Sequence, residues 1–219
     1  YTPAELVIER CANADIVINN KVILGADILS QLPKLKYIGL LSTGFNVVDI
    51  EYAKKAGITV TNVPTYSTAA VAQMTFALIL EIYNQVGIHS KAVHDGEWTA
   101  CRDFCFWKKP LLELNGKTIG LIGYGKIGSE VAKIADAFSM NILCYVPSIK
   151  PQPDFRSFRF VSLDELADQS DIVSLHCPLT PETQGIINED FLSKMKPGAI
   201  VINTSRGPSV DEKALADAL

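Results

Sequence analysis

Residues 117–128 read Lys-Thr-Ile-Gly-Leu-Ile-Gly-Tyr-Gly-Lys-Ile-Gly, a short apolar run that leads into closely spaced glycines. The apolar half is typical of a buried strand, and the segment Ile127–Phe138 after it has the pattern of a helix. In this G-x-G-x-x-G spacing Gly123 makes a tight turn, Gly125 lets phosphates approach the backbone, and Gly128 allows close packing of helix on strand. The free N–H groups and the positive dipole end of the helix favour an anion. The pattern therefore predicts a dinucleotide-binding turn, and the alternative is a glycine-rich turn without a ligand.

The acidic residue that usually accompanies this turn is missing. A second strand, Asn141–Tyr145, follows the helix, and an Asp or Glu that binds the adenosine ribose is expected at its end, about 20 residues beyond the glycines. Val146 stands there instead. Without a carboxylate nothing repels a 2′-phosphate, which Ser148, Lys150 or Arg156 could contact; the alternative is that the basic residues are solvated loop charges. The choice between NAD and NADP stays open.

Strand and helix patterns alternate on both sides of this turn. Most of the predicted strands are continuous apolar runs, as expected for parallel strands that are buried on both faces. The predicted strands are residues 15–19, 37–41, 59–62, 118–122, 141–145, 171–175 and 199–203. Two of the helices between them are predicted to begin at capping boxes, Ser162-x-x-Glu165 and Ser209-x-x-Glu212. This alternation predicts an α/β fold of two doubly wound parallel-sheet domains.

The domain change is predicted between two helices. A long helix is expected over about residues 65–86 and a second one over His89–Asp95, followed by an irregular, aromatic and basic stretch, Glu97–Leu114. We therefore expect one domain over residues 1–88, incomplete at both chain ends, and a dinucleotide-binding domain over residues 89–219, truncated at its C-terminal end.

Composition and charge argue against several classes of protein. The chain has 219 residues, of which 48% are hydrophobic and 20% charged, as in globular proteins. Twenty basic and 24 acidic residues give a net charge of −4 without a basic tract. This balance argues against nucleic acid or an anionic membrane surface as a partner. The longest apolar stretch, Val71–Tyr83, is interrupted by Gln73 and Glu81 and is too short to span a membrane.

The cysteines and the first residue bear on the cellular compartment. Five scattered cysteines without a C-x-x-C pair predict no disulfide framework and favour the cytoplasm. The three histidines do not complete a metal-ligand pattern with them, so no metal site is expected. The chain begins at Tyr1, without a signal-like segment and without methionine, so we expect it to be trimmed.

Four further segments, together with the glycine turn, point to one family. They are Ser42–Asp49 (Ser-Thr-Gly-Phe-Asn-Val-Val-Asp), Asn62–Thr75, His176–Thr180 (His-Cys-Pro-Leu-Thr) and Ile202–Asp211 (Ile-Asn-Thr-Ser-Arg-Gly-Pro-Ser-Val-Asp). Their order and spacing resemble the D-isomer-specific 2-hydroxyacid dehydrogenases over essentially the whole chain. The sequence Asp103-Phe-Cys-Phe-Trp107 is similar to the glycerate dehydrogenase (hydroxypyruvate reductase) branch. The resemblance implies a substrate domain built from the N-terminal part and a C-terminal return segment, with a Rossmann domain that binds NAD or NADP inserted between them.

The resemblance also implies roles for particular residues. The carboxylate of a 2-oxo acid is expected to meet backbone N–H groups at Ser42, Thr43 and Gly44, and Arg206 is expected to hold the carboxylate and the carbonyl. A planar guanidinium suits a carboxylate beside a carbonyl because it can donate two hydrogen bonds and polarise the carbonyl. The alternative for Arg206 is a surface salt bridge. The expected cofactor contacts are Thr75, Gly123, Gly125, Lys126, Ile127, Gly128, Val146, Cys177, Pro178, Thr204 and Ser205. Without the resemblance, Thr75 is interpreted as a buried helix threonine bonded to its own turn, and Cys177 as a small core residue.

The proton donor of the family has no expected counterpart in this sequence. The resemblance places a histidine and its supporting glutamate beyond Leu219. We expect His176 to be packed at a strand end, and His89 and His94 to be exposed near the domain change. Without an imidazole of near-neutral pKa, hydride transfer lacks a general acid, so the chain alone should be a poor catalyst. Either the sequence omits residues that the protein has, which we favour because Leu219 stops inside a capped helix, or the molecule is a true fragment.

The leading functional prediction is an oxidoreductase that transfers a hydride between NAD(P)H and a small 2-oxo acid, most simply hydroxypyruvate or glyoxylate. The alternative is a dinucleotide-sensing binding protein or corepressor on the same fold, without catalysis. A glutamate and a histidine at the family positions would favour the enzyme. The resemblance also implies a homodimer, formed through the Rossmann domain and the aromatic stretch Trp98–Trp107.

Overall fold

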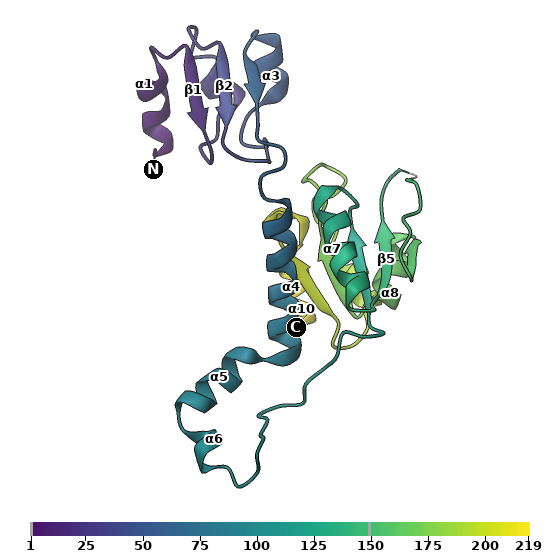
Figure 1. The fold of residues 1–219 in the computed structure, drawn as a ribbon. Coiled ribbons are helices and arrows are strands. Elements are labelled where there is room, and N and C mark those ends of the chain that lie inside the picture. The colour runs from purple at the N-terminus through teal and green to yellow at the C-terminus, as the bar shows by residue number, and fades with distance from the viewer. Residues whose placement is uncertain (1, 149) are drawn as a thin grey trace. The chain divides into compact units, whose positions relative to one another are not determined.

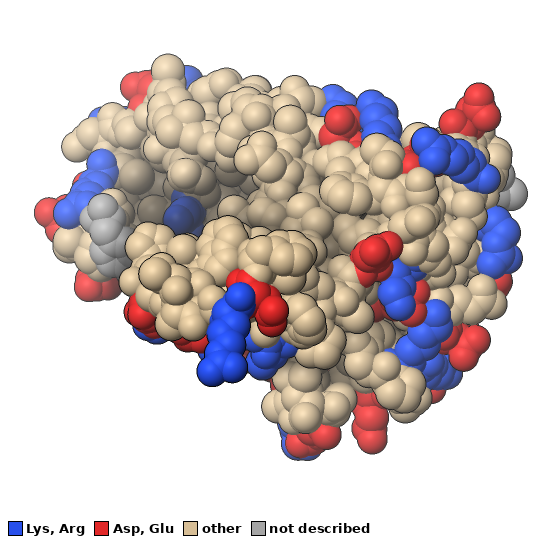
Figure 2. All heavy atoms as spheres, turned by 60° about the horizontal axis from the view of Figure 1, so that its bottom comes forward, with Lys and Arg blue, Asp and Glu red and all other residues tan. Residues whose placement is uncertain are grey.

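The computed structural model describes residues 2–148 and 150–219 (Figure 1). Contacts between residues divide it into two compact units, one ending at Ser67 and one comprising Thr68–Leu219. Among the helices that the structure describes, none combines the length and the apolar character needed to cross a bilayer. On the face drawn in Figure 2, the described basic and acidic side chains are interspersed among larger areas of other residues.

The division lies before the long helix rather than after it. Helix α4 (Thr68–Asn84) packs within the second unit, where the ring of Phe76 stacks on that of Phe138 with their centroids 5.5 Å apart. The domain change was predicted near residue 88 because the aromatic and irregular stretch Glu97–Leu114 separates two sets of strands and helices. The apolar face of α4 instead belongs to the core of the unit that follows it.

The first unit is a three-stranded parallel sheet with its core on one face. Its strands, in spatial order, are β1 (Ile16–Asn19), β2 (Tyr37–Leu40) and β3 (Thr59–Thr61). Its helices are the 3₁₀ turn η1 (Ala4–Leu6), α1 (Val7–Cys11), α2 (Ala26–Leu29) and α3 (Ile50–Lys55). Ile38 and Leu40 of β2 are buried against these helices, whereas Ile16 and Ile18 of β1 remain exposed on the other face. The three strand predictions agree with these bounds to within one residue.

The second unit is a five-stranded parallel sheet in the order β6-β5-β4-β7-β8. The strands are β4 (Thr118–Ile122), β5 (Asn141–Tyr145), β6 (Phe158–Phe160), β7 (Ile172–Leu175) and β8 (Ile200–Asn203). The helices of this unit, besides α4, are α7 (Lys126–Ala137), α8 (Leu163–Gln169), α9 (Glu189–Lys194) and α10 (Glu212–Ala218), of which α10 packs on α9. Successive residues of β4 face two different cores. Leu121 packs beside α4 and α7, and Ile122 packs beside α8 and α9. The α/β prediction of doubly wound parallel sheets is confirmed.

Strand order reverses next to β4, because the chain runs from β4 to β5 and β6 on one side and continues with β7 and β8 on the other. In open α/β sheets, ligands bind beyond the carboxyl ends of the strands at such a reversal. The edge strand β6 was missed by the sequence reasoning. It has three residues, Phe-Arg-Phe, and pairs with β5, so it lacks the continuous apolar run of the inner strands.

One of the two predicted helix starts has its serine N-cap. The Ser162 hydroxyl accepts a 3.1 Å hydrogen bond from the Glu165 N–H at the start of α8. The other prediction is wrong, because Ser209 lies in a 3₁₀ turn, η2 (Gly207–Ser209), and α10 is capped by Asp211. Val210 pairs with Ile187 in an isolated β-bridge, and this extended backbone prevents the helix from starting earlier.

The aromatic stretch forms an arm of the second unit, which Figure 1 shows extending away from the sheet. The arm contains α5 (Val86–His94) and α6 (Glu97–Ala100). The expectation that His89 is exposed is wrong: it is half-buried, its Nδ1 lies 2.8 Å from the Gln85 carbonyl oxygen, and its Nε2 accepts from the Lys108 N–H. His94 is exposed, as expected.

Candidate functional site

The glycine turn has the backbone geometry that its spacing predicts. Gly123 has a φ of +104°, and a Cβ on it would lie 2.8 Å from the Cys177 nitrogen and from the His176 carbonyl carbon. A Cβ on Gly128 would lie 2.2 Å from the Gly123 oxygen. A Cβ on Gly125 would meet nothing within 4 Å. Two glycines therefore permit close backbone packing, and the third leaves open space at the start of the helix.

Helix α7 begins at this open space. Lys126 and Ile127 form its first turn, and Gly125 is its N-cap, with no capping hydrogen bond from a side chain in the described part of the chain. Four other helices are capped by a side-chain oxygen, from Asp49, Ser162, Asn188 and Asp211. The first N–H groups of α7 thus lack the side-chain partner that the other four helices have, and they carry the positive end of the helix dipole. This arrangement fits the pyrophosphate of a dinucleotide.

The ends of three central strands meet at the turn. The Gly123 N–H donates to the Tyr145 carbonyl at the end of β5, and the His176 N–H after β7 donates to the Ile122 carbonyl. Val146 therefore lies beside the turn, where its side chain packs against the core and offers no hydrogen-bond acceptor. Cys177 is half-buried at the same edge, and Pro178 is exposed.

Residues suggested by the sequence for a 2′-phosphate are separated by the structure. The Lys150 ammonium donates a 2.6 Å hydrogen bond to the Tyr124 carbonyl inside the glycine turn. Arg156 is bound instead at the far end of α7, where its guanidinium donates to the Ser139 hydroxyl and its N–H to Asp136. A helix of 12 residues is about 18 Å long, so the suggestion that Arg156 contacts a phosphate at the turn is wrong.

The loop after β8 carries Arg206 and is held by an asparagine. The Asn203 side chain donates to the Arg206 carbonyl at 2.8 Å and accepts from both the N–H and the hydroxyl of Ser205, each at 3.0 Å. Arg206 is exposed, and its guanidinium donates to the Ser205 carbonyl. Sequence reasoning missed Asn203, although its position at the end of a strand, directly before Thr-Ser-Arg, was a usable signal.

Thr75 is fully buried in α4 and reaches this loop through Thr204. Its hydroxyl lies 2.9 Å from the Val71 carbonyl, one turn back, and 3.2 Å from the Thr204 hydroxyl. The interpretation as a buried helix threonine is confirmed, and the structure adds the link to β8. Because its side chain is fully buried, Thr75 supports the loop of Arg206 through its contact with Thr204.

His176 is packed at the end of β7, as expected. Its Nε2 lies 2.9 Å from the Ser174 hydroxyl, and its buried Nδ1 has no hydrogen-bond partner among the described residues. Burial lowers the pKa of His176 to about 4. The imidazole is therefore neutral near pH 7 and cannot act as the general acid. Burial also raises the pKa of the neighbouring Cys177 thiol.

The expected substrate loop lies in the first unit, after β2. The Ser42 hydroxyl donates to the Gly44 carbonyl at 2.7 Å, and the Thr43 carbonyl accepts from the Asn62 side chain at 2.8 Å. The Thr43 hydroxyl donates to the Val63 carbonyl, so the loop is fixed to the segment that follows β3. These hydrogen bonds involve side chains and carbonyl groups of the loop, and they fix the conformation of its backbone.

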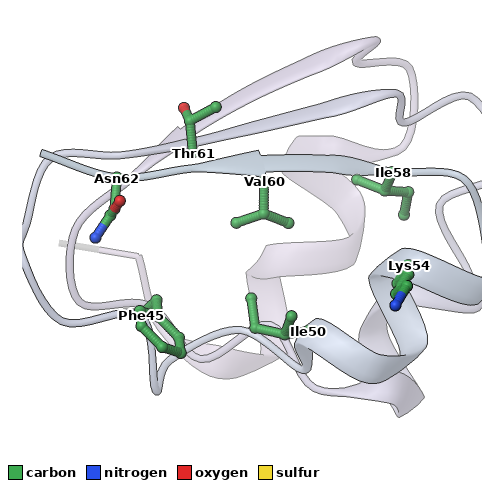
Figure 3. Close-up of a pocket in the computed structure, with 7 residues that line it drawn as sticks. All are labelled: Phe45, Ile50, Lys54, Ile58, Val60, Thr61 and Asn62. Carbon is green, nitrogen blue, oxygen red and sulfur yellow. The ribbon is translucent and has the colours of Figure 1, made fainter. Parts of the chain in front are cut away.

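A pocket of about 360 Å³ opens beside this loop in the first unit (Figure 3). Figure 3 shows Phe45 and Asn62 at one end and Lys54 at the other, with apolar side chains between them. The lining residues are Phe45, Ile50, Lys54, Ile58, Val60, Thr61 and Asn62. Sequence reasoning did not predict this pocket, and its mostly apolar lining does not match a small charged acid.

Comparisons with known proteins identify the family. Residues 76–219 match the model of the D-isomer specific 2-hydroxyacid dehydrogenase, NAD binding domain. Hydroxypyruvate reductase from Blautia hydrogenotrophica is 48% identical over 218 residues, which cover all of this chain and 68% of the relative. The chain belongs to the D-isomer specific 2-hydroxyacid dehydrogenases. The resemblance stated from the motifs is thus confirmed, as is the prediction of an NAD(P)-dependent dehydrogenase.

Two similar solved structures contain different forms of the cofactor. D-lactate dehydrogenase from Aquifex aeolicus, complexed with NAD and lactic acid, has a TM-score of 0.84 and 37% identity, over 99% of this chain and 63% of its own. An acyclic imino acid reductase in complex with NADPH and D-Arg has a TM-score of 0.86 and 33% identity, over 100% of this chain and 69% of its own. NAD or NADP is therefore the cofactor type of this dehydrogenase.

Proposed function

We propose that the protein reduces hydroxypyruvate or glyoxylate to the corresponding 2-hydroxy acid with NADH or NADPH. The observation that carries this proposal is the gathering of the glycine turn, Cys177 and the loop of Arg206 at the carboxyl edge of one parallel sheet, next to its reversal of strand order. The similarity to a hydroxypyruvate reductase at 48% identity supports the choice of substrate.

The cofactor is held by the residues along this edge. The first N–H groups of α7, at Lys126 and Ile127, bind the pyrophosphate in the space left by Gly125. Val146, Cys177 and Pro178 line the adenosine side, and Thr204 and Ser205 approach the nicotinamide ribose. When bound, the cofactor supplies a hydride from its nicotinamide ring.

Arg206 orients the 2-oxo acid. The guanidinium donates two hydrogen bonds to the carboxylate and carbonyl of the 2-oxo acid and polarises the carbonyl as negative charge develops on its oxygen. Asn203 holds the backbone from which this side chain projects. For the loop Ser42–Gly44 of the first unit, binding of a carboxylate by its backbone N–H groups stays a prediction.

The proton for the carbonyl oxygen needs a group that titrates near neutral pH. None of the three histidines in the described chain serves, because His176 is packed and neutral, His89 is bonded within the arm and His94 is exposed on α5.

We assign substrate binding to residues 1–88 and cofactor binding to residues 89–219, with α4 packed on the cofactor-binding sheet. The arm supports a homodimer, because Trp98, Phe104 and Trp107 expose 49%, 90% and 68% of their surfaces. The five free thiols suit a reducing compartment, the cytoplasm.

The test is oxidation of NADH and NADPH by the full-length gene product with hydroxypyruvate, glyoxylate and pyruvate, followed by the absorbance of the reduced nicotinamide. We expect fastest turnover with hydroxypyruvate or glyoxylate. Normal cofactor binding without turnover of any 2-oxo acid would contradict the proposal and favour a dinucleotide sensor.

A further inference from the structure

Lys150 joins two loops that are far apart in the sequence. Its backbone belongs to the loop after β5, and its ammonium donates to the carbonyl of Tyr124, which stands between Gly123 and Gly125 in the turn. The turn faces the pyrophosphate of a dinucleotide, and the end of β5 faces the adenosine ribose. A dinucleotide bound at this turn would bring these two parts of the cofactor close to the ammonium.

The Tyr124 carbonyl, which accepts the hydrogen bond from Lys150, is held in a fixed place. The Tyr124 ring packs edge-on against Phe158 and Phe160, with ring centroids 5.2 and 5.9 Å apart. Phe158 and Phe160 also contact each other in β6, which pairs with β5. The aromatic cluster thus ties the glycine turn to the edge of the sheet and fixes the position to which Lys150 returns.

The electrostatic surroundings favour an anion at this position. The residue at the end of β5 is Val146, which packs against the core instead of presenting a carboxylate to the ribose hydroxyls. In residues 2–148 and 150–219, no carboxylate lies within 4.0 Å of the Lys150 ammonium. The ammonium is bonded to a neutral carbonyl, a weaker partner than a phosphate dianion.

We propose that Lys150 binds the 2′-phosphate of NADPH and makes the protein prefer the phosphorylated dinucleotide. This inference rests on the proposed function only in requiring a dinucleotide at the turn. Lysine binds phosphate as a compact charge, and its flexible stem lets the ammonium leave the Tyr124 carbonyl for a nearby anion. The same ammonium could otherwise contact the pyrophosphate that NAD and NADP share, so the test must separate the two.

The test compares 2′,5′-ADP with 5′-ADP, which differ in the 2′-phosphate, by calorimetric titration of the full-length protein. We expect 2′,5′-ADP to bind about 10- to 100-fold more tightly, the range of one charge-assisted contact. Lys150→Met should remove this preference and leave binding of 5′-ADP unchanged, whereas Lys150→Arg should keep it. Arg156→Met is the matched control, because Arg156 lies at the other end of α7, and it should behave as the wild type.

Equal affinity of the wild type for both nucleotides would overturn the proposal. An equal loss for both in Lys150→Met would assign the lysine to the pyrophosphate and would also overturn it. Neither outcome touches the choice of 2-oxo acid, because the titration requires no turnover. If neither nucleotide bound the wild type, the proposed function would fail together with this inference.

Discussion

The hydroxyl groups of Thr75 and Thr204 lie 3.2 Å apart, although 129 residues separate them in the sequence. This hydrogen bond joins α4 to the end of β8, directly before the loop of Arg206. We expect Thr75→Val, which keeps the shape and removes the hydroxyl, to weaken binding of the reduced cofactor about three- to tenfold because Thr204 loses its partner.

Fluorescence titration with NADH and NADPH measures this effect. Thr75→Ser keeps the hydroxyl and should bind the cofactor as the wild type does. If the valine variant bound the cofactor with unchanged affinity, the hydrogen bond would have no role in positioning the loop.

Alanine substitutions at two glycines of the turn are expected to impair different properties, stability in one case and cofactor binding in the other. Gly123→Ala places a methyl group 2.8 Å from the backbone after β7 at a positive φ, so we expect a loss of at least about 2 kcal/mol in the free energy of unfolding. Gly125→Ala points its methyl group into open space at an ordinary φ of −88°. It should keep the stability of the wild type and lose cofactor binding, because the methyl group occupies the space of the phosphates.

Thermal unfolding and NADH titration, applied to both variants, separate the two effects. A Gly125→Ala variant that binds NADH normally would show that the phosphates do not approach this glycine.

Arg206 is expected to act through the geometry of its guanidinium and not only through its charge. Arg206→Lys retains the charge and loses the paired hydrogen bonds, so we expect kcat/KM for the 2-oxo acid to fall about 100-fold or more. Cofactor affinity should stay the same in this variant. Steady-state kinetics and NADH titration check the two statements, and wild-type kcat/KM in the lysine variant would remove Arg206 from the mechanism.

The buried imidazole of His176 makes stability depend on pH. Its pKa is lowered from 6.5 to about 4 by burial, so the unfolded chain binds a proton between these values that the folded chain does not. Stability from this residue is therefore complete above pH 6.5 and falls as the pH drops toward 4, by up to about 3 kcal/mol.

Urea unfolding across this pH range, compared between the wild type and His176→Gln, isolates the contribution. The difference between the two proteins should shrink steadily as the pH falls. A difference that stays constant with pH would mean that the imidazole titrates normally in the folded state.

The arm is expected to carry the dimer contact. Phe104 exposes 90% of its surface, and Phe104→Glu should convert the dimer to a monomer because it places a charge in an apolar contact. Ile23→Glu is the control, since Ile23 is also exposed, at 69%, but lies in the first unit. Sedimentation equilibrium at micromolar concentration measures the mass. A wild-type monomer would contradict the proposed dimer itself.

Much of the local structure followed from the sequence alone. Every strand except β6 was predicted to within about one residue, because a strand buried on both faces leaves a continuous apolar run. The glycine turn was equally readable, since a positive φ at Gly123 and the contact at Gly128 leave no room for another residue. Ser209 failed as a cap because a β-bridge at Val210, formed with a distant segment, decided where the helix starts.

The tertiary structure decided which side chains meet. Lys150 and Arg156 are equivalent candidates in the sequence, yet one reaches the Tyr124 carbonyl and the other is bound at the opposite end of α7. The same holds for the contact between Thr75 and Thr204. Periodicity and backbone sterics act over a few residues, so the sequence determined the elements and the turn. Contacts between distant residues depend on strand order and helix packing, which no local pattern encodes.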